Sequence, residues 1–266
     1  MIKIYFDNAY INVRKIRRYK MKHFWINIDS NEKRKNYMTE QYEKMNLEHY
    51  RVSAFTPNDF DEMLEQKRPL TCKYPGCNTC EYEFACISSH VKAIQEGLKS
   101  GDEYFIVMED DIYMPFVIDY DSLVKDVPKD TEILQMLILY GPTVKHLFNI
   151  YKNTGCKYIK WKYLLPSTGM YMVSRKGAQK IVDMFYDSTT KKYDFSRSPY
   201  QIVADVCLYE TALTYAITLP YVYPNTEMGS DIHPDHITAH SKAVIDIKAV
   251  MSENKSVAFP FVKSCN

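Results

Sequence analysis

The chain has 266 residues, 46% of them hydrophobic, which is enough for one large α/β domain with a sizeable core. Its 34 basic and 33 acidic residues leave a net charge of +1, which argues against general nucleic-acid binding, because such proteins carry a clear basic excess. Seven cysteines are an odd number for a disulfide framework.

The start of the chain predicts neither a secretory signal nor a membrane anchor. Met1–Tyr10 lacks a basic stretch followed by an apolar core, and no segment approaches the length of a transmembrane helix. The basic stretch Val13–Lys22 could touch an anionic membrane surface, but we interpret residues 1–22 as a solvated extension before one domain of residues 23–266. We therefore expect a cytoplasmic protein, in a bacterium or in the host cytoplasm of a virus.

Residues 23–55 predict a β-α-β unit. His23–Ile28 is a short apolar run typical of a strand, and Ser30 can cap a helix over Asn31–Met45, in which apolar residues recur at helical spacing. Tyr50–Phe55 predicts a second strand, which ends at a turn. Because a helix connects the two strands, we expect them to pair in parallel.

Four of the cysteines cluster after this unit. Cys72, Cys77, Cys80 and Cys86 have the spacing C-x4-C-x2-C-x5-C, and thiolates at short spacing can close a tetrahedral zinc site. However, only one pair has the usual two-residue gap, and Cys86 lies at the start of a helix predicted over Phe84–Lys99. We therefore favour reduced thiols on a loop, or one disulfide in an oxidising setting, over zinc.

Residues 104–111 read YFIVMEDD, an apolar run that ends abruptly at three carboxylates. The run predicts a buried strand, and open α/β sheets bind ligands at the carboxyl ends of their strands. Glu109, Asp110 and Asp111 would repel one another on a tight turn, and Mg2+ or Mn2+, completed by water and substrate phosphates, would relieve this repulsion. The first interpretation is a metal–diphosphate site, although a solvated acidic turn would be preferred on these three residues alone.

The rest of the chain continues to alternate predicted helices and strands, so the whole is interpreted as one mixed α/β domain with an irregular C-terminal part. Ser174 is a predicted N-cap, and Tyr140-Gly141-Pro142 is predicted to end a strand. The predicted helices are Asp119–Val127, Arg175–Tyr186 and Ala204–Leu213, and the extended segments are Thr131–Leu139, Lys157–Leu164, Thr168–Val173 and Ile217–Val222.

Several segments form a recognisable pattern in order and spacing. They are WINIDSNEKR (Trp25–Arg34), VSAF (Val52–Phe55), ACISSHVKAIQEG (Ala85–Gly97), YFIVMEDDI (Tyr104–Ile112), GMYMVSRKGAQKI (Gly169–Ile181), the Asp205 region and PNTEMGSDI (Pro224–Ile232). In this combination the chain resembles glycosyltransferase family 25, which includes bacterial lipooligosaccharide galactosyltransferases and collagen hydroxylysine galactosyltransferases. The Cys/Pro-rich segment Lys73–Glu81 and the first 22 residues depart from the family pattern.

The resemblance implies a GT-A-like nucleotide-sugar-binding domain with a mixed, mainly parallel central sheet. It implies that Asn27, Asp29 and Arg34 face the nucleotide, although Arg34 is equally well interpreted as an exposed helix charge. Ser89 and His90 would line or support the donor pocket, with a hydrogen-bonded core histidine as the alternative for His90.

The same resemblance assigns roles within the acidic motif. Asp111 is the first candidate for binding the metal ion, with Glu109 or Asp110 second. Alternation along an extended segment directs Glu109 and Asp111 to one side. Asp110, directed to the other side, would contact the sugar or ribose. GT-A enzymes often add a histidine ligand from the C-terminal part, and His233 is the first candidate, followed by His236 and His240. For each one taken singly, a surface histidine is the preferred interpretation.

An inverting transfer, as the family's galactosyl transfer implies, needs a base for the acceptor hydroxyl. Asp205 matches the family's acidic position, with a capping or salt-bridged Asp as the alternative, and Glu210 is the second candidate.

The expected function is metal-dependent transfer of a hexose, galactose or glucose, from a UDP-sugar to a glycan, glycoprotein or hydroxylysine acceptor, as in lipopolysaccharide biosynthesis. A nucleotidyl- or phosphotransferase is disfavoured because the chain has no P-loop. A degenerate domain with a binding or assembly role is disfavoured by the intact acidic motif.

Overall fold

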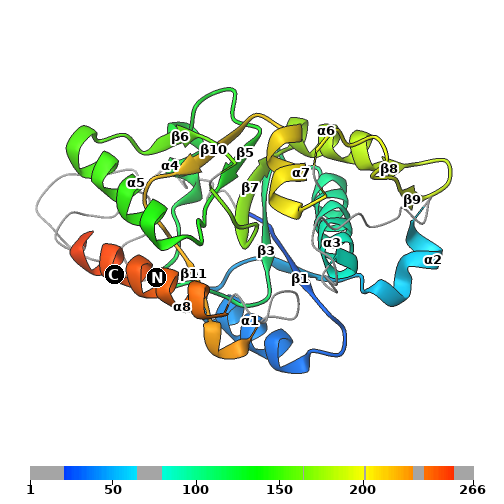
Figure 1. Ribbon diagram of the computed structural model, residues 1–266, viewed down its shortest axis with the longest axis horizontal. Coiled ribbons are helices and arrows are strands. Elements are labelled where there is room, and N and C mark those ends of the chain that lie inside the picture. The colour runs from blue at the N-terminus through cyan, green and yellow to red at the C-terminus, as the bar shows by residue number, and fades with distance from the viewer. Residues whose placement is uncertain (1–20, 65–79, 164, 201, 230–236, 255–266) are drawn as a thin grey trace, which may run out of the picture.

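The computed structural model describes residues 21–64, 80–163, 165–200, 202–229 and 237–254 (Figure 1). Its centre is a seven-stranded sheet with the order β2-β1-β3-β7-β5-β10-β6. These strands are β1 (His23–Asn27), β2 (His49–Ser53), β3 (Tyr104–Glu109), β5 (Ile133–Gln135), β6 (Tyr158–Lys160), β7 (Met170–Ser174) and β10 (Thr214–Ile217). Only β7 and the edge strand β6 run against the other five. The predicted mixed, mainly parallel sheet of an α/β protein is confirmed.

The predicted β-α-β unit is present, with α1 (Glu32–Met45) between the parallel strands β1 and β2. The N-cap is Asn31, whose side chain accepts a hydrogen bond from the Arg34 amide, and not Ser30 as predicted. At the other end Asn46 has a left-handed φ of 50°. The buried face of α1 consists of Arg34, Met38, Gln41 and Tyr42. It therefore directs two polar side chains inward.

Three helices group together beside the N-terminal half of the sheet (Figure 1). They are α3 (Cys80–Lys99), α6 (Arg175–Phe185) and α7 (Ala204–Thr211). The longest, α3, packs against β1, β2 and β3 and contacts both of the others. Ser174 caps α6 as predicted, because its side chain accepts a hydrogen bond from the Gly177 amide. The helix predicted from Phe84 begins four residues earlier.

Two long helices were not predicted, and they pack against each other (Figure 1). α5 (Gly141–Thr154) begins with a Gly-Pro pair that the sequence analysis interpreted only as the end of a strand. Proline is well tolerated in the first helical turn, and Gly155, with a φ of 70°, terminates the helix. α8 (Ile237–Glu253) occupies much of the C-terminal part that was predicted to be irregular.

The remaining elements are short. The strand predicted over Thr131–Leu139 is regular only in β5, and the strand predicted over Ile217–Val222 lies earlier, at β10. Within the described parts of the chain, no helix combines the length and apolar character needed to cross a membrane. The other elements are η1 (Pro57–Asp59), α2 (Phe60–Met63), β4 (Ile112–Tyr113), α4 (Tyr120–Asp126), β8 (Tyr186–Asp187), β9 (Lys192–Tyr193), β11 (Tyr223–Pro224) and η2 (Thr226–Met228).

Candidate active site

The acidic motif lies at the end of the sheet where the carboxyl ends of β1 and β3 lie next to the amino end of β7. β3 ends at Glu109, its parallel neighbour β1 ends at Asn27, and its antiparallel neighbour β7 begins shortly after Thr168. Asp110 and Asp111 form the turn that leads into β4. Strand pairing therefore brings polar residues from three distant segments to the carboxyl end of β3, the position where the sequence analysis expected a ligand.

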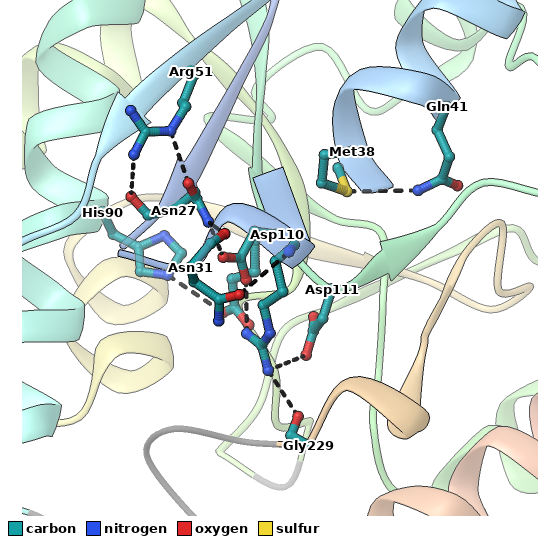
Figure 2. Close-up of polar contacts among 11 residues, drawn as sticks. Asn27, Asn31, Met38, Gln41, Arg51, His90, Asp110, Asp111 and Gly229 are labelled. Carbon is teal, nitrogen blue, oxygen red and sulfur yellow. Dashed lines mark hydrogen bonds and ion pairs between the residues drawn. The ribbon is translucent and has the colours of Figure 1, made fainter. Parts of the chain in front are cut away.

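Asp110 anchors the motif and is almost fully buried. Its Oδ2 accepts a hydrogen bond of 2.7 Å from Asn27 Nδ2 (Figure 2). Its Oδ1 accepts one of 2.7 Å from Arg34 Nη1. Burial raises the pKa of the Asp110 carboxyl, and the Arg34 charge and both hydrogen bonds oppose this rise. Since protein donors engage both oxygens, Asp110 is arranged to hold the turn in place. Its contact with a sugar or ribose stays a prediction.

Glu109 is held by its Oε1 atom. That oxygen accepts a hydrogen bond of 2.7 Å from Thr168 Oγ1 and lies 3.4 Å from His90 Nε2. His90 is buried, and its Nδ1 lies 3.1 Å from the Tyr171 hydroxyl. Burial raises the pKa of Glu109, but the interactions with His90, Thr168 and Arg34 outweigh burial and lower the pKa overall. His90 therefore supports Glu109 from within the core.

Asp111 is the carboxylate whose charge is least well compensated by the protein. Its Oδ2 lies 3.9 Å from Arg34 Nη2, too far for a hydrogen bond. Burial raises the pKa of Asp111 to about 7, and the neighbouring Glu109 charge contributes to that rise. A positive charge placed beside Asp111 and Glu109 would stabilise both carboxylates.

The residues of this site fit a hard divalent cation. Mg2+ and Mn2+ are commonly held by one or two carboxylates, with substrate oxygens and water completing the coordination. Glu109 and Asp111 supply such a pair, whereas the described residues hold no group of three His, Cys, Asp or Glu side chains suited to a metal ion. The first two histidine candidates, His233 and His236, lie outside the described residues. His240 is described, and it lines the larger cavity beside the motif.

Two cavities flank the motif, and Cys86, Glu109 and Asp111 line both of them. The Asp205 cavity has a volume of about 260 Å³, and the Phe55 cavity has a volume of about 130 Å³. The walls of the Asp205 cavity include Glu83, Leu139, Ser167, Thr168, Asp205 and His240. The walls of the Phe55 cavity include Asn27, Arg34, Phe55, Tyr82, Ser89 and His90. Two ligands could therefore approach the carboxylates from two sides.

Four of the five residues expected on the nucleotide side or in the donor pocket line the Phe55 cavity: Asn27, Arg34, Ser89 and His90. Arg34 is buried and also donates a hydrogen bond of 2.8 Å to the Gly229 carbonyl, so it is not an exposed helix charge. Asp29 lies at the surface, where it pairs with Arg51, and it is not part of either cavity wall.

Asp205 lies in the first turn of α7 and in the wall of the cavity named after it. It accepts hydrogen bonds from the backbone amides of Val206, at 2.8 Å, and Ser167, at 3.3 Å. Burial raises its pKa, and these bonds oppose the rise. Glu210, the second candidate base, is exposed and lies outside that wall. Five residues correspond to about 140° of rotation around a helix, so the two side chains face different directions.

Comparison with known proteins identifies the family. The sequence profile described as "Glycosyltransferase family 25 (LPS biosynthesis protein)" matches residues 20–196, well over half of the chain. The chain belongs to glycosyltransferase family 25. The matched part of this family 25 protein contains β1, α1, the acidic motif and Thr168, and it ends before Asp205 and Glu210.

A Haemophilus influenzae protein described as "Putative glycosyltransferase" is 24% identical over 169 residues. The match covers 60% of this chain and 56% of the relative, so it spans little more than half of the relative's length. Among solved structures, a glycosyltransferase involved in the glycosylation of the major capsid of PBCV-1 aligns with 60% of this chain and 61% of its own, at 10% identity and a TM-score of 0.30.

The turn at Ser167 is a feature of the site that was not predicted. Ser167 has a φ of 115°, in the region that favours glycine. Its carbonyl accepts hydrogen bonds of 2.9 Å from Gln135 Nε2 and from the Tyr209 hydroxyl, which hold the unusual conformation. The next residue, Thr168, holds Glu109, so one turn contacts both the candidate base and the acidic motif. The available sequence signal was Gln135, a polar residue within an apolar run.

The cysteine cluster is described only in part. Cys72 and Cys77 lie outside the described residues, as does the side chain of Cys80. Cys86 is a free thiol within α3, and burial raises its pKa well above the ordinary value. The zinc and disulfide interpretations for the other cysteines stay predictions.

Proposed function

We propose that this family 25 protein is a metal-dependent hexosyltransferase that moves galactose or glucose from a UDP-sugar to a hydroxyl group of a glycan or glycoprotein, with inversion. The observation that carries this proposal is that Glu109 and Asp111 line both cavities, at the place where a donor and an acceptor would meet. A divalent cation bound there would stabilise the negative charge that develops on the diphosphate leaving group.

The Phe55 cavity is the better candidate for the nucleoside. Its walls combine the aromatic side chains of Phe55 and Tyr82 with polar groups from Asn27 and Ser89. Small-molecule sites commonly have this composition, in which apolar walls supply most of the contact and a few polar groups set the orientation. On this assignment Arg34, between the cavity and the motif, supplies positive charge close to the diphosphate.

The Asp205 cavity is then assigned to the acceptor. A base must lie within hydrogen-bond reach of the hydroxyl whose proton it accepts, and Asp205 is in the wall of this cavity. Burial raises its pKa, which increases its affinity for that proton. His240 and Glu83 line the same cavity and offer further polar contacts to a sugar. Lipopolysaccharide-type glycans are the acceptor class that the family description favours.

The test is release of UDP from a panel of UDP-sugars in the presence of Mn2+. Wild type is compared with Asp111→Asn, and Glu40→Gln, an exposed change on α1, is the matched control. We expect one or two donors to be hydrolysed by wild type and the control, and activity to fall at least about 100-fold in Asp111→Asn. Equal activity in Asp111→Asn would refute the role of the carboxylate. If UDP raises the melting temperature with Mn2+ but no donor is turned over even with glycan acceptors, the domain has a binding role instead.

A further inference from the structure

The side chain of Gln41 pairs with the backbone of the segment that follows the acidic motif. Its Nε2 donates a hydrogen bond of 2.9 Å to the Ile112 carbonyl, and its Oε1 accepts one of 2.9 Å from the Met114 amide. All three residues are buried. The second Nε2 hydrogen is directed at Met38 Sδ, 3.6 Å away (Figure 2). The amide is thus fully used inside the protein.

This pairing takes the place of a neighbouring strand. On one side, the segment is held by backbone groups: β4 pairs with β11, and the Asn225 amide donates a hydrogen bond of 2.6 Å to the Asp111 carbonyl. On the other side lies α1, whose own backbone groups are occupied within the helix. Buried backbone groups require partners, and the Gln41 amide supplies one donor and one acceptor, as a residue in a strand would.

Gln41 shares its helix face with the residue that holds Asp110. It follows Arg34 by seven residues, which is about two helical turns or about 10 Å along the axis. Arg34 fixes the side chain before Asp111, and Gln41 fixes the backbone after it. Within the described residues, the Asp111 carboxylate makes one distant ion pair, with Arg34 at 3.9 Å. Its position therefore depends on the backbone around it, which the Asn225 amide holds from one side and Arg34 and Gln41 hold from α1.

We infer that Gln41 is a positioning residue for the reaction, acting through Asp111. Its amide fixes the orientation of the Asp111 carboxylate relative to Glu109, so that the two can share one divalent cation. This inference rests on the proposed function. The chemistry selects glutamine: glutamate of the same length cannot donate to the Ile112 carbonyl when ionised, and methionine of similar size can neither donate nor accept in this way.

The experiment compares wild type, Gln41→Met, Gln41→Glu and a control, Thr218→Val. Thr218 is also buried, and the single hydrogen of its hydroxyl is shared between the carbonyls of Cys156, at 2.8 Å, and Lys157, at 3.1 Å, far along the chain from the motif. Urea unfolding measures the stability of each variant, and all comparisons are made where every variant is folded. Amide hydrogen exchange of residues 109–116 reports on the backbone attachment. The Mn2+ requirement is the Mn2+ concentration that gives half of the UDP-induced rise in melting temperature. It measures how well Asp111 is placed to bind the metal ion.

In Gln41→Met we expect the Met114 amide to exchange faster and the Mn2+ requirement to rise about 10-fold or more, the size of effect seen when a partner of a metal ligand is removed. Gln41→Glu retains the acceptor for the Met114 amide. Its Met114 exchange rate and its Mn2+ requirement should therefore lie between those of Gln41→Met and wild type. Thr218→Val should lose stability without either change.

Two results would overturn the inference in distinguishable ways. A Mn2+ requirement in Gln41→Met equal to that of Thr218→Val would show that Gln41 contributes to stability alone. Absence of Mn2+-dependent UDP binding in wild type would refute the proposed function itself, and the positioning role would fall with it.

Discussion

Replacing Arg34 with methionine tests whether a buried ion pair holds the acidic motif. In the folded protein Arg34 and Asp110 form a pair at 2.7 Å, with 9% and 8% of their side chains exposed. Methionine fills a similar volume but removes the charge, leaving Asp110 buried with Asn27 as its remaining donor and close to Glu109 and Asp111. Removing one partner of a buried pair typically costs about 3–5 kcal/mol of unfolding free energy.

The structure sets an upper limit on this loss, because Asp110 can take up a proton instead of remaining charged. At pH 7, protonating a carboxyl group with an ordinary pKa near 3.9 costs about 4 kcal/mol. At pH 5 the same step costs about 1.5 kcal/mol. We therefore expect Arg34→Met to lower the free energy of unfolding by about 3–4 kcal/mol at pH 7 and by only about 1–1.5 kcal/mol at pH 5.

Urea unfolding at the two pH values measures both losses. Lys35→Met is the matched control, since Lys35 forms an exposed pair with Glu32 on the same helix and should cost less than about 0.5 kcal/mol. Asp110→Asn in the Arg34→Met background should recover much of the stability at pH 7, because no buried charge is then left without its partner. A loss below 1 kcal/mol at both pH values, or a double variant as unstable as the sum of the single ones, would refute this reasoning.

Three further predictions concern other parts of the chain. Glu132 is buried, and although burial raises its pKa, the Leu213 amide and two lysines lower it to about 2. The stability it contributes is therefore complete above about pH 4.5 and lost as the pH falls toward 2. We expect Glu132→Gln to lower the free energy of unfolding by about 1–2 kcal/mol at pH 7, a modest loss because solvent screens the lysines. In urea unfolding, its free energy of unfolding should change less than that of wild type between pH 4.5 and 2. Asp205→Asn should abolish sugar transfer but retain Mn2+-dependent UDP binding, whereas Glu210→Gln should transfer the sugar normally. If a UDP-release assay shows the opposite pattern, Glu210 and not Asp205 is the base. In Gly97→Ala the added methyl group would overlap the Phe105 ring, so we expect the free energy of unfolding to fall by about 1–3 kcal/mol, and an unchanged thermal midpoint would contradict this packing.

Local sequence patterns were sufficient for much of the fold. The apolar runs at β1 and β3, the helix of α1 and the Ser174 cap of α6 all follow from periodicity and capping chemistry that involve neighbouring residues. The same holds for the position of the acidic motif, since an apolar run that ends in carboxylates marks the end of a buried strand. The two long helices that were missed, α5 and α8, begin with or follow turn-forming residues whose signals are compatible with more than one structure.

The individual roles within the site depended on the tertiary structure. Three adjacent carboxylates look alike in the sequence, yet Asp110 is engaged by Asn27 and Arg34, and Asp111 faces the cavities. Likewise, Asp29 pairs with Arg51 on a neighbouring strand instead of facing a cavity.

The family, the main strands and the place of the acidic motif could be predicted from the sequence, because these depend on residues close together along the chain. Which carboxylates face the cavities, and which side chains hold them, depends on how the chain folds. Thr168 contacts Glu109, Gln41 contacts the segment after the motif, and Gly229 contacts Arg34, all from segments far away in sequence. Hydrogen bonds and burial act over a few ångströms in space, and a sequence contains no local signal for neighbours that folding alone brings together.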